Sequence, residues 1–165
     1  MSDETPAAPP VIRLATSADV GIIDELDRMS SSPTRNIPRE MEKYFGSVDP
    51  STHERTLIFL AEVGGQVAAK AEMMLAPAST DAEVVASPRV GYVKRVIVAP
   101  EYRKLGLARQ LMEHIIDYAR TELALTAIDL HVWEQNIPAI RLYESLGFVV
   151  QHRELYFHLD LRTLL

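Results

Sequence analysis

The chain has 165 residues, of which 47% are hydrophobic and 24% charged, a composition typical of one globular domain. It contains no cysteine, which excludes a disulfide framework, a cysteine nucleophile and thiolate metal ligands. Its net charge of −6 argues against nonspecific binding to nucleic acid. No apolar run approaches the length of about 20 residues that a membrane span needs, and the acidic amino terminus lacks a signal-peptide pattern. We therefore expect a cytoplasmic protein, and the spacing of the five histidines predicts no metal site.

The first part of the chain predicts a tail, a strand and a helix. Residues 1–10 contain three prolines and few side chains to bury, which predicts a disordered tail. Val11–Leu14 is a short apolar run that predicts a strand. Thr16 precedes Asp19 by three residues, the spacing of a capping box, and apolar residues at helical spacing follow as far as Met29.

A second helix and a hairpin are predicted next. Residues 38–46 favour a helix because proline occupies the first position and glycine the last. The runs 56–63 and 66–75 are strand-like, and Gly64 and Gly65 between them tolerate the positive φ of a tight turn. This pattern predicts an antiparallel hairpin.

The rest of the sequence alternates between strands and helices. The predicted elements are a strand at 90–98, a helix at 105–123, a strand at 127–133, a helix at 136–146, and terminal strands at 148–150 and 154–161. The strand–helix–strand unit at 90–133 requires a right-handed crossover and a parallel pair, whereas the preceding hairpin is antiparallel. We therefore predict one α/β (α+β) domain over 11–165, with a mixed sheet of about six to seven strands and about four helices.

Residues 96–109 carry the clearest chemical signal. A strand ends there, and a helix begins at a segment that reads Arg103-x-x-Gly106-x-Ala108. The first turn of a helix has unpaired N–H groups and a partial positive charge, and small residues let a phosphate approach the backbone. Residues 94–109 hold five basic residues and one acid, a net charge of +4 that predicts a small anionic ligand. The alternative is that Gly106 relieves crowding and the basic residues form a solvated face.

A second segment follows the next predicted strand and contains Asn136, Ala139, Leu142-Tyr143 and Gly147-Phe148. The two segments together resemble the GNAT superfamily of N-acetyltransferases. The first is similar to that family's acetyl-coenzyme A pyrophosphate loop, and the second to its Asn…Ala…Leu-Tyr…Gly-Phe helix. The resemblance covers residues 12–161, because the order of the predicted elements matches the order in the family.

The resemblance implies how acetyl-coenzyme A, the cosubstrate, is bound. The parallel strands at 93–98 and 128–133 are expected to splay apart, so that the pantetheine arm pairs with exposed strand backbone and the pyrophosphate binds helix amides. A backbone amide near Val98 is expected to polarise the thioester carbonyl. The implied cofactor-binding residues are Val96, Ile97, Val98, Arg103, Lys104, Leu105, Gly106, Leu107, Ala108, Arg109, Asn136 and Tyr143.

Tyr143 is implied as the general acid that protonates the leaving thiolate, since a phenol is protonated at neutral pH. Without the family, a Tyr one turn before a Gly-Phe pair is most often a core residue. Asn136 is expected either to bind the pantetheine arm or to cap the helix.

The sequence departs from the family at the general base. Many relatives carry an acidic residue on the strand before the pyrophosphate loop, whereas residues 92–95 here read Tyr-Val-Lys-Arg. An amine acceptor must lose a proton before it attacks. We predict Glu72 on the neighbouring strand as the catalytic base, with Glu62, His131 or a chain of waters as alternatives.

Tyr92 and Lys94 are predicted to bind the acceptor. Strand alternation places both side chains on one face, and a lysine there favours an acceptor that carries a carboxylate or phosphate. The alternative is a solvated lysine.

The resemblance implies an acetyl-coenzyme A-dependent N-acetyltransferase that transfers directly to an amine of a small molecule or peptide. Two alternatives stay open: a noncatalytic coenzyme A-binding sensor, and a protein N-terminal acetyltransferase. The exposed edge of the terminal strands, together with the dimers formed by many relatives, predicts a homodimer.

Overall fold

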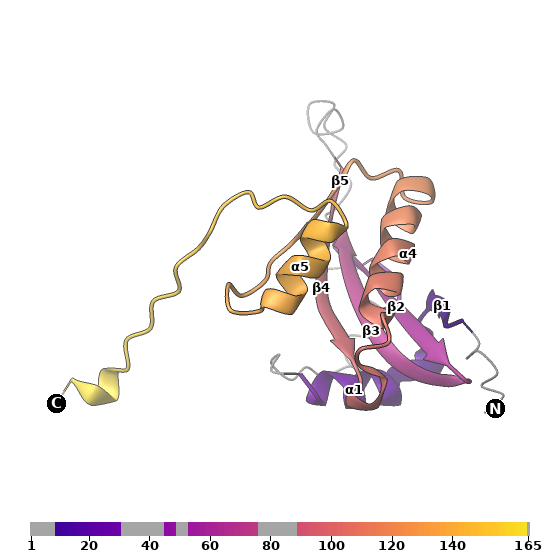
Figure 1. Ribbon diagram of the computed structural model, residues 1–165, viewed down its shortest axis with the longest axis horizontal. Helices are drawn as coiled ribbons and strands as arrows, with labels where there is room; N and C mark the ends of the chain where they lie inside the picture. The colour runs from indigo at the N-terminus through magenta and orange to yellow at the C-terminus, as the bar shows by residue number, and fades with distance from the viewer. Residues whose placement is uncertain (1–8, 31–44, 49–52, 76–88, 165) are drawn as a thin grey trace, which may run out of the picture. The chain divides into compact units, whose positions relative to one another are not determined.

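The computed structural model of the chain describes residues 9–30, 45–48, 53–75 and 89–164. The chain divides into two compact units, residues 1–131 and residues 132–165. The elements of the first unit are β1 (Val11–Leu14), the 3-10 turn η1 (Ser17–Asp19), α1 (Val20–Arg28), β2 (Arg55–Val63), β3 (Gln66–Leu75), β4 (Val90–Val98), the 3-10 turn η3 (Pro100–Tyr102), α4 (Leu107–Thr121) and β5 (Ala127–Leu130) (Figure 1). The second unit contains α5 (Ile137–Ser145) and the 3-10 turn η4 (Leu161–Thr163).

The first unit is built on a five-stranded sheet in the order β1-β2-β3-β4-β5. The first four strands pair antiparallel, and β4 and β5 pair parallel through the crossover helix α4. The predicted hairpin is confirmed: Gly64 and Gly65 join β2 to β3 with φ of +58° and +80°, the two positive values of a type I′ turn. The mixed sheet and its parallel pair follow the sequence-based prediction.

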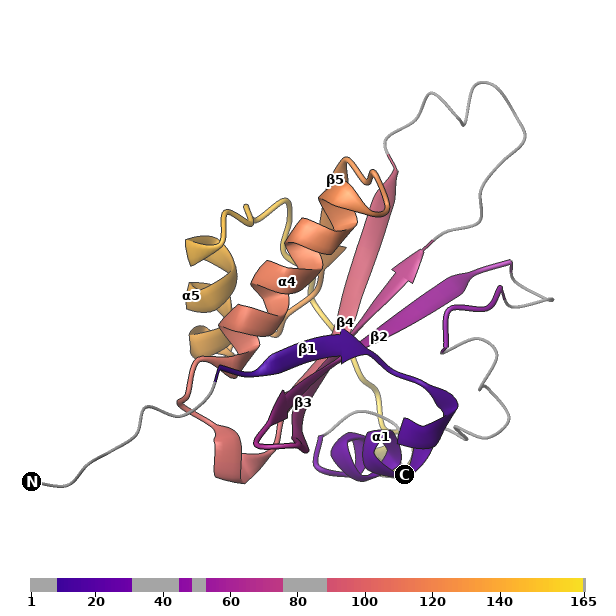
Figure 2. The ribbon, with the colours of Figure 1, turned by 90° about the vertical axis from the view of Figure 1, so that its right-hand side faces the viewer.

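Helices α1 and α4 cover opposite faces of this sheet. The Phe59 ring on β2 lies 5.3 Å from the Tyr118 ring of α4, centroid to centroid. Its neighbours Ile58 and Leu60 form a buried cluster with Ile23 of α1. Because successive side chains of a strand point to opposite faces, α4 packs on the Phe59 face and α1 on the other. Figure 2 shows α4 lying along the strands and α1 apart from it.

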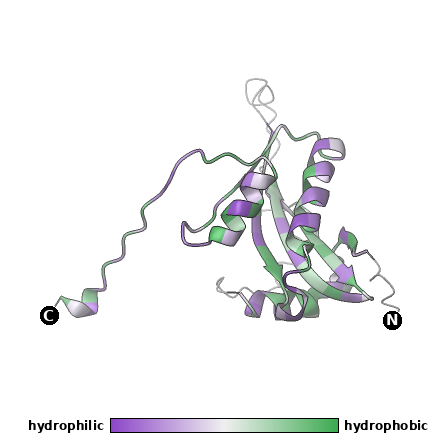
Figure 3. Cartoon of the chain, viewed as in Figure 1, coloured by the Kyte–Doolittle hydropathy of each residue, from purple (hydrophilic) through white to green (hydrophobic). Residues whose placement is uncertain are grey.

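Helix α4 is the longest of the described helices, with 15 residues. Leu111, Met112 and Ile115 lie on one side of it and are fully buried. Hydrophobic and hydrophilic residues alternate along it, as Figure 3 shows. No helix within the described ranges is long and apolar enough to cross a membrane.

The start of α1 is held by the predicted capping box. The Thr16 N–H donates to Asp19 Oδ2 over 2.8 Å. Arg13 on β1 adds a contact that the sequence pattern did not reveal, since its guanidinium donates to both Asp19 carboxylate oxygens at 2.8 Å. The hydrogen bonds from Arg13 hold the pKa of Asp19 at about 2, below the usual value of about 3.9.

Three predictions need correction or lie outside the described residues. Residues 148–150 and 154–161 form no strand in the structure, so the sheet has five strands and the described chain three α-helices. Alternating apolar residues favour a strand, but a strand also needs a ladder partner, and local pattern cannot supply one. The homodimer that these strands suggested therefore stays a prediction. The helix at 38–46 and the tail at 1–10 fall mostly outside the described residues.

Candidate functional site

Strand β4 loses one of its two neighbours part-way along its length. Its ladder with β5 runs from Val90 opposite Ala127 to Val93 opposite Leu130, where β5 ends. Strand β4 continues to Val98, and its ladder with β3 extends there, with Val98 opposite Ala69. Of the described strands, only β3 is paired with β4 at its carboxyl end. The ladder stops here because β5 ends at Leu130, three residues short of the predicted strand at 127–133, and splaying of the pair stays a prediction.

Helix α4 begins directly after this strand end and the turn η3. Gly106 is the residue before its first turn and has φ +77°, a left-handed conformation that favours glycine. The first helical backbone bond joins the Gln110 N–H to the Gly106 carbonyl over 3.1 Å. The N–H groups of Leu107 and Ala108 therefore have no partner inside the helix, and no side chain caps them. Because the Leu107 side chain is buried in the core, these amides offer an anion a backbone site.

The basic residues around this helix start are partly neutralised. Arg109 Nη1 lies 3.8 Å from a carboxylate oxygen of Glu113, and Arg95 Nε lies 3.7 Å from Glu72 Oε2. Residues 94–109 have a net charge of +4. Together with these two acids, which lie outside the segment, the net charge of the group is +2. Arg103 Nε donates to the Val98 carbonyl over 3.2 Å and so links the loop to the end of β4. Lys104 and Leu105 are exposed.

Tyr92 and Lys94 lie on the same face of β4, as predicted. They stand opposite Met74 and Glu72 of β3, and the register shift comes after Lys94, so alternation between them is preserved. The Tyr92 hydroxyl is 2.7 Å from His131 Nδ1, just beyond the end of β5. The predicted acceptor residues thus lie on the α1 face of the sheet, next to the point where the parallel ladder ends.

Glu72, the predicted base, is completely buried on that same face. Lys70 Nζ lies 3.1 Å from Glu72 Oε1 and 2.6 Å from Asp27 Oδ1 of α1, and Lys70 is also completely buried. A carboxylate held in this way is better suited to fix its neighbours than to take a proton from a bound amine, and its role as base stays a prediction. Sequence reasoning missed Lys70 and Asp27. The available signal was the pair of charges at alternate positions in the otherwise apolar run of β3.

In the second unit, Asn136 caps helix α5. Its side-chain oxygen accepts the Ala139 N–H over 3.3 Å, and Pro138 occupies the first turn, where no N–H is needed. The capping interpretation of Asn136 is confirmed. Binding of the pantetheine arm by the same residue stays a prediction.

The end of α5 explains the spacing of Tyr143, Gly147 and Phe148. The Phe148 N–H donates to the Tyr143 carbonyl and the Gly147 N–H to the Glu144 carbonyl, which is the hydrogen-bond pattern of a Schellman motif. Gly147 has φ +100°, and the rings of Tyr143 and Phe148 pack edge to face at 5.7 Å. Burial raises the pKa of the Tyr143 hydroxyl above its usual value of about 10, so the phenol is protonated at neutral pH.

The sequence model of the acetyltransferase (GNAT) family matches residues 23–148, which is more than half of the chain and includes both motif segments. The chain belongs to the acetyltransferase (GNAT) family.

Curated relatives match this GNAT chain over shorter stretches. It is 38% identical over 68 residues to the N-terminal acetyltransferase B complex catalytic subunit NAA20 of Arabidopsis thaliana, a match that covers 41% of this chain and 39% of that protein. It is 42% identical over 65 residues to a spermidine N(1)-acetyltransferase of Vibrio cholerae, covering 36% of this chain and 38% of the relative. The chain thus spans about two fifths of the length of these relatives.

The fold of this GNAT chain is also present in solved structures. The structure of AAC(6′)-Iy in complex with the bisubstrate analogue CoA-S-monomethyl-acetylneamine superimposes with a TM-score of 0.71. The superposition covers 93% of this chain and 99% of that protein at 15% sequence identity, so it shows a shared fold.

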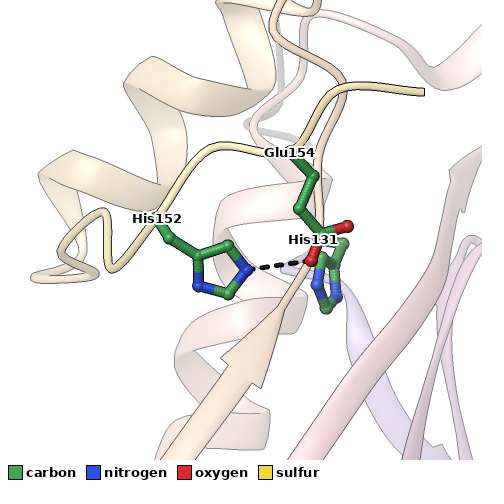
Figure 4. A group of neighbouring side chains, drawn as sticks. All are labelled: His131, His152 and Glu154. Atoms are coloured by element: carbon green, nitrogen blue, oxygen red, sulfur yellow. Dashed lines mark hydrogen bonds and ion pairs between the residues drawn. The ribbon is translucent and has the colours of Figure 1, made fainter. Parts of the chain in front are cut away.

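The remaining charged pairs of the second unit lie at its surface. His152 Nε2 is 2.9 Å from Glu154 Oε1 (Figure 4), and Arg153 Nη1 is 3.1 Å from Glu134 Oε1. All four side chains are well exposed, and exposed pairs of this kind contribute little to stability.

Proposed function

We propose that this protein is an N-acetyltransferase that uses acetyl-coenzyme A and transfers the acetyl group directly to a primary amine of a small molecule or peptide. One observation carries the proposal: β4 extends beyond the end of its parallel partner β5, and the left-handed Gly106 and the first turn of α4 follow shortly after it. Membership of the GNAT family supports the same chemistry. The names of the relatives, an N-terminal acetyltransferase and a spermidine acetyltransferase, both describe acetyl transfer to nitrogen.

The proposed binding mode uses backbone groups more than side chains. The pantetheine arm adds to the backbone of Val96–Val98 as a peptide adds to a sheet edge. The pyrophosphate binds the amides of residues 107–109, and the exposed Arg103 and Lys104 add positive charge beside them. The open space around the Cα of Gly106 fits this binding mode, because no other atom lies within 4 Å of the place a side chain would occupy.

In the proposed reaction the neutral amine attacks the carbonyl carbon of the thioester in a ternary complex. The C–N bond forms and the C–S bond breaks, the thiolate takes the proton of the Tyr143 hydroxyl, and a base takes the excess proton of the nitrogen. The Tyr143 hydroxyl is protonated at neutral pH, as a general acid must be, and its raised pKa means that it gives up the proton only to a strong base such as the departing thiolate. For the base, Glu72 is the candidate from the sequence, and Glu62, His131 or a chain of waters remain the alternatives.

We further propose that Tyr92 and Lys94 bind the acceptor, and that the acceptor carries a carboxylate or phosphate near its amine. Both side chains lie on the α1 face of the sheet, half-buried, beside the end of the parallel ladder. Replacing Lys94 by methionine is expected to raise KM for such acceptors while leaving KM for acetyl-coenzyme A unchanged. If a screen yields only polyamines or aminoglycosides, the preference for acidic acceptors is wrong.

The deciding experiment combines calorimetric titration with coenzyme A and a screen of amines for the release of free coenzyme A. Binding together with acceptor-dependent release supports the transferase. Binding without release by any amine, peptide termini included, favours the noncatalytic sensor, and absence of binding overturns both. Gly106→Ala is expected to lower the affinity for coenzyme A. Gly64→Ala, which also forces a side chain into a positive φ but at the hairpin turn, is the matched control and is expected to leave the affinity unchanged.

The role of Tyr143 has its own test. Tyr143→Phe keeps the ring contact with Phe148 and removes only the hydroxyl. We expect kcat to fall about 100-fold or more with little change in the affinity for coenzyme A. An unchanged kcat would exclude Tyr143 as the acid.

A further inference from the structure

A chain of buried charges connects α1 to β4 through β3. Asp27 of α1 lies 2.6 Å from Lys70, Lys70 lies 3.1 Å from Glu72, and Glu72 lies 3.7 Å from Arg95. The side chains of Lys70 and Glu72 have no exposed surface, that of Asp27 is 6% exposed and that of Arg95 is 18% exposed. Two anions alternate with two cations, so each buried charge lies next to an opposite one. We name these four residues the buried ion chain.

The last member of the buried ion chain has an unusual backbone. Arg95 has φ +52°, in the left-handed region that is unfavourable for residues with a side chain. The β3–β4 register shifts at the same place: Lys70 faces Ile97 and Glu72 faces Lys94, so β4 has two residues where β3 has one. This is a β-bulge, and an arginine at such a φ requires a contact that holds it there. The ion pair with Glu72 is such a contact.

The position of this bulge connects it to the proposed reaction. It consists of Arg95 and Val96, begins two residues after Val93, the last β4 residue paired with β5, and so includes the first residue of Val96–Val98. A bulge redirects the strand that follows it, so its conformation sets where those backbone groups point.

We propose that the buried ion chain is a positioning device, in which Asp27 and Lys70 orient Glu72, and Glu72 holds the Arg95 bulge so that Val96–Val98 can bind the thioester arm of acetyl-coenzyme A. Glu72 then acts on the reaction through Arg95 and takes no proton from the acceptor. This inference rests on the proposed function, because it assumes that Val96–Val98 binds the cosubstrate.

Two substitutions of Arg95 separate the backbone from the side chain. Arg95→Ala removes the ion pair and leaves a Cβ at a positive φ, so the bulge is expected to relax. Arg95→Gly also removes the ion pair, but glycine adopts this φ without strain, so the bulge is expected to persist. By calorimetry with coenzyme A we expect Arg95→Ala to bind about tenfold more weakly than the wild type, and Arg95→Gly to recover most of that loss. Equal losses in both variants would mean that the arginine side chain contacts the ligand directly, and would overturn the proposal.

The matched control for the glycine effect is Ala124→Gly. Ala124 also has a positive φ, +50°, and lies in the connection between α4 and β5. We expect this variant to bind coenzyme A as the wild type does. A gain in affinity as large as that of Arg95→Gly over Arg95→Ala would show that glycine alters binding wherever it relieves strain, and would contradict a specific role for the bulge.

Glu72→Gln distinguishes positioning from proton transfer. If Glu72 holds Arg95, kcat/KM is expected to fall by about tenfold or more. The loss is the same at every pH, because hydroxide cannot replace the charge that held Arg95. If Glu72 is the base, the loss is largest at neutral pH and recovers at high pH, where the free amine is already deprotonated. Recovery at high pH would overturn the positioning role.

A measurement on the ligand-free protein tests this inference independently of the proposed function. Backbone chemical shifts of Val96–Val98 and Ala71, measured by NMR on the ligand-free protein, are expected to change in Arg95→Ala and Glu72→Gln and to stay close to the wild type in Arg95→Gly. If the wild type binds no coenzyme A, the proposed function fails while these shifts still test the bulge. Unchanged shifts in Arg95→Ala would overturn the role of the ion pair whatever the ligand does.

Discussion

The two faces of the sheet are buried by different means. On the α4 face the contacts are apolar or aromatic, with Phe59 packed against Tyr118 and with Leu111 and Ile115 of α4 completely buried. On the α1 face, apolar contacts such as Ile23 with Leu60 stand beside the buried ion chain. One sheet thus has an apolar face and a face that contains buried charge.

The difference shows what each face contributes. Apolar burial stabilises roughly in proportion to area and imposes little directional geometry. Buried ions cost desolvation energy that their mutual attraction only approximately offsets, but they fix distances and angles between elements. The α1 face is also the one on which Tyr92 and Lys94 lie. The geometry-setting interactions therefore occur on the face proposed to receive the acceptor.

The largest effect is expected from breaking the ion chain at its centre. Lys70→Met removes one cation and leaves the carboxylates of Asp27 and Glu72 buried without it. Breaking a buried pair in this way typically costs about 3–5 kcal/mol, so we expect the free energy of unfolding, measured by urea denaturation, to fall by about that amount.

The control for this prediction is the double variant Lys70→Met with Asp27→Asn. It removes one positive and one negative charge and leaves the pair of Glu72 with Arg95. We expect it to be more stable than the single variant, because no excess negative charge stays buried. A double variant no more stable than Lys70→Met would mean that the cost comes from packing of the lysine stem and not from charge.

A smaller effect is expected on the α4 side of the sheet, at Gly91. A Cβ built there would lie 2.8 Å from Met73 Sδ and 2.9 Å from Leu125 Cδ1, closer than real contacts allow. Both atoms end flexible side chains, so Gly91→Ala is expected to lower the free energy of unfolding by about 1 kcal/mol, the low end for an overpacked core.

Gly21→Ala is the matched comparison for Gly91→Ala. Gly21 lies in α1, and no atom lies within 4 Å of the place that an alanine Cβ would occupy. Alanine in a helix is more favourable than glycine, so this variant is expected to gain about 0.5–1 kcal/mol in the same urea experiment. Equal losses in the two variants would contradict the steric explanation for Gly91.

The elements that the sequence predicted well depend on local signals. The Gly64-Gly65 turn, the Thr16 and Asp19 capping box and the cap at Asn136 are each set by residues a few positions apart. The buried ion chain was missed because it joins α1, β3 and β4: the packing of α1 on the sheet brings Asp27 to Lys70, and the sheet register brings Arg95 to Glu72.

The same reasoning accounts for the terminal segments and for the candidate site. Residues 154–161 alternate in hydropathy, but a strand also requires a partner, which local pattern does not encode. The Arg103-x-x-Gly106 segment could be recognised from the sequence because the left-handed position before the helix is occupied by glycine, the residue that favours this conformation. The left-handed conformation of Arg95 could not be predicted, since arginine has no special preference for it.

A comparably small effect is expected from an ion pair at the partly exposed edge of the charged face. Arg13 lies opposite Leu60 of β2, and its guanidinium contacts Asp19, whose pKa is held at about 2. Because the folded-state pKa is below the unfolded value of about 3.9, this carboxylate stabilises the fold above about pH 4, and the stabilisation is lost as the pH falls towards 2. Asp19→Asn keeps an oxygen that can cap the helix and removes the charge. We expect the variant to be less stable than the wild type by about 1 kcal/mol at pH 7 and equally stable near pH 2.

The control for this pH dependence is Asp24→Asn. Asp24 pairs with Arg28 over 2.9 Å on the exposed side of α1, where solvent screens the interaction. Urea denaturation between pH 2 and pH 7 measures the free energy of unfolding of the two variants and the wild type. The contributions of carboxylates that all three proteins share cancel in the differences between them. If the difference in the free energy of unfolding between Asp19→Asn and the wild type stays constant over this range, the loss of stability in this variant is steric. The Arg13 pair would then contribute no more to stability than the exposed pair at Asp24, and the contrast between buried and exposed charge would rest on Lys70 alone.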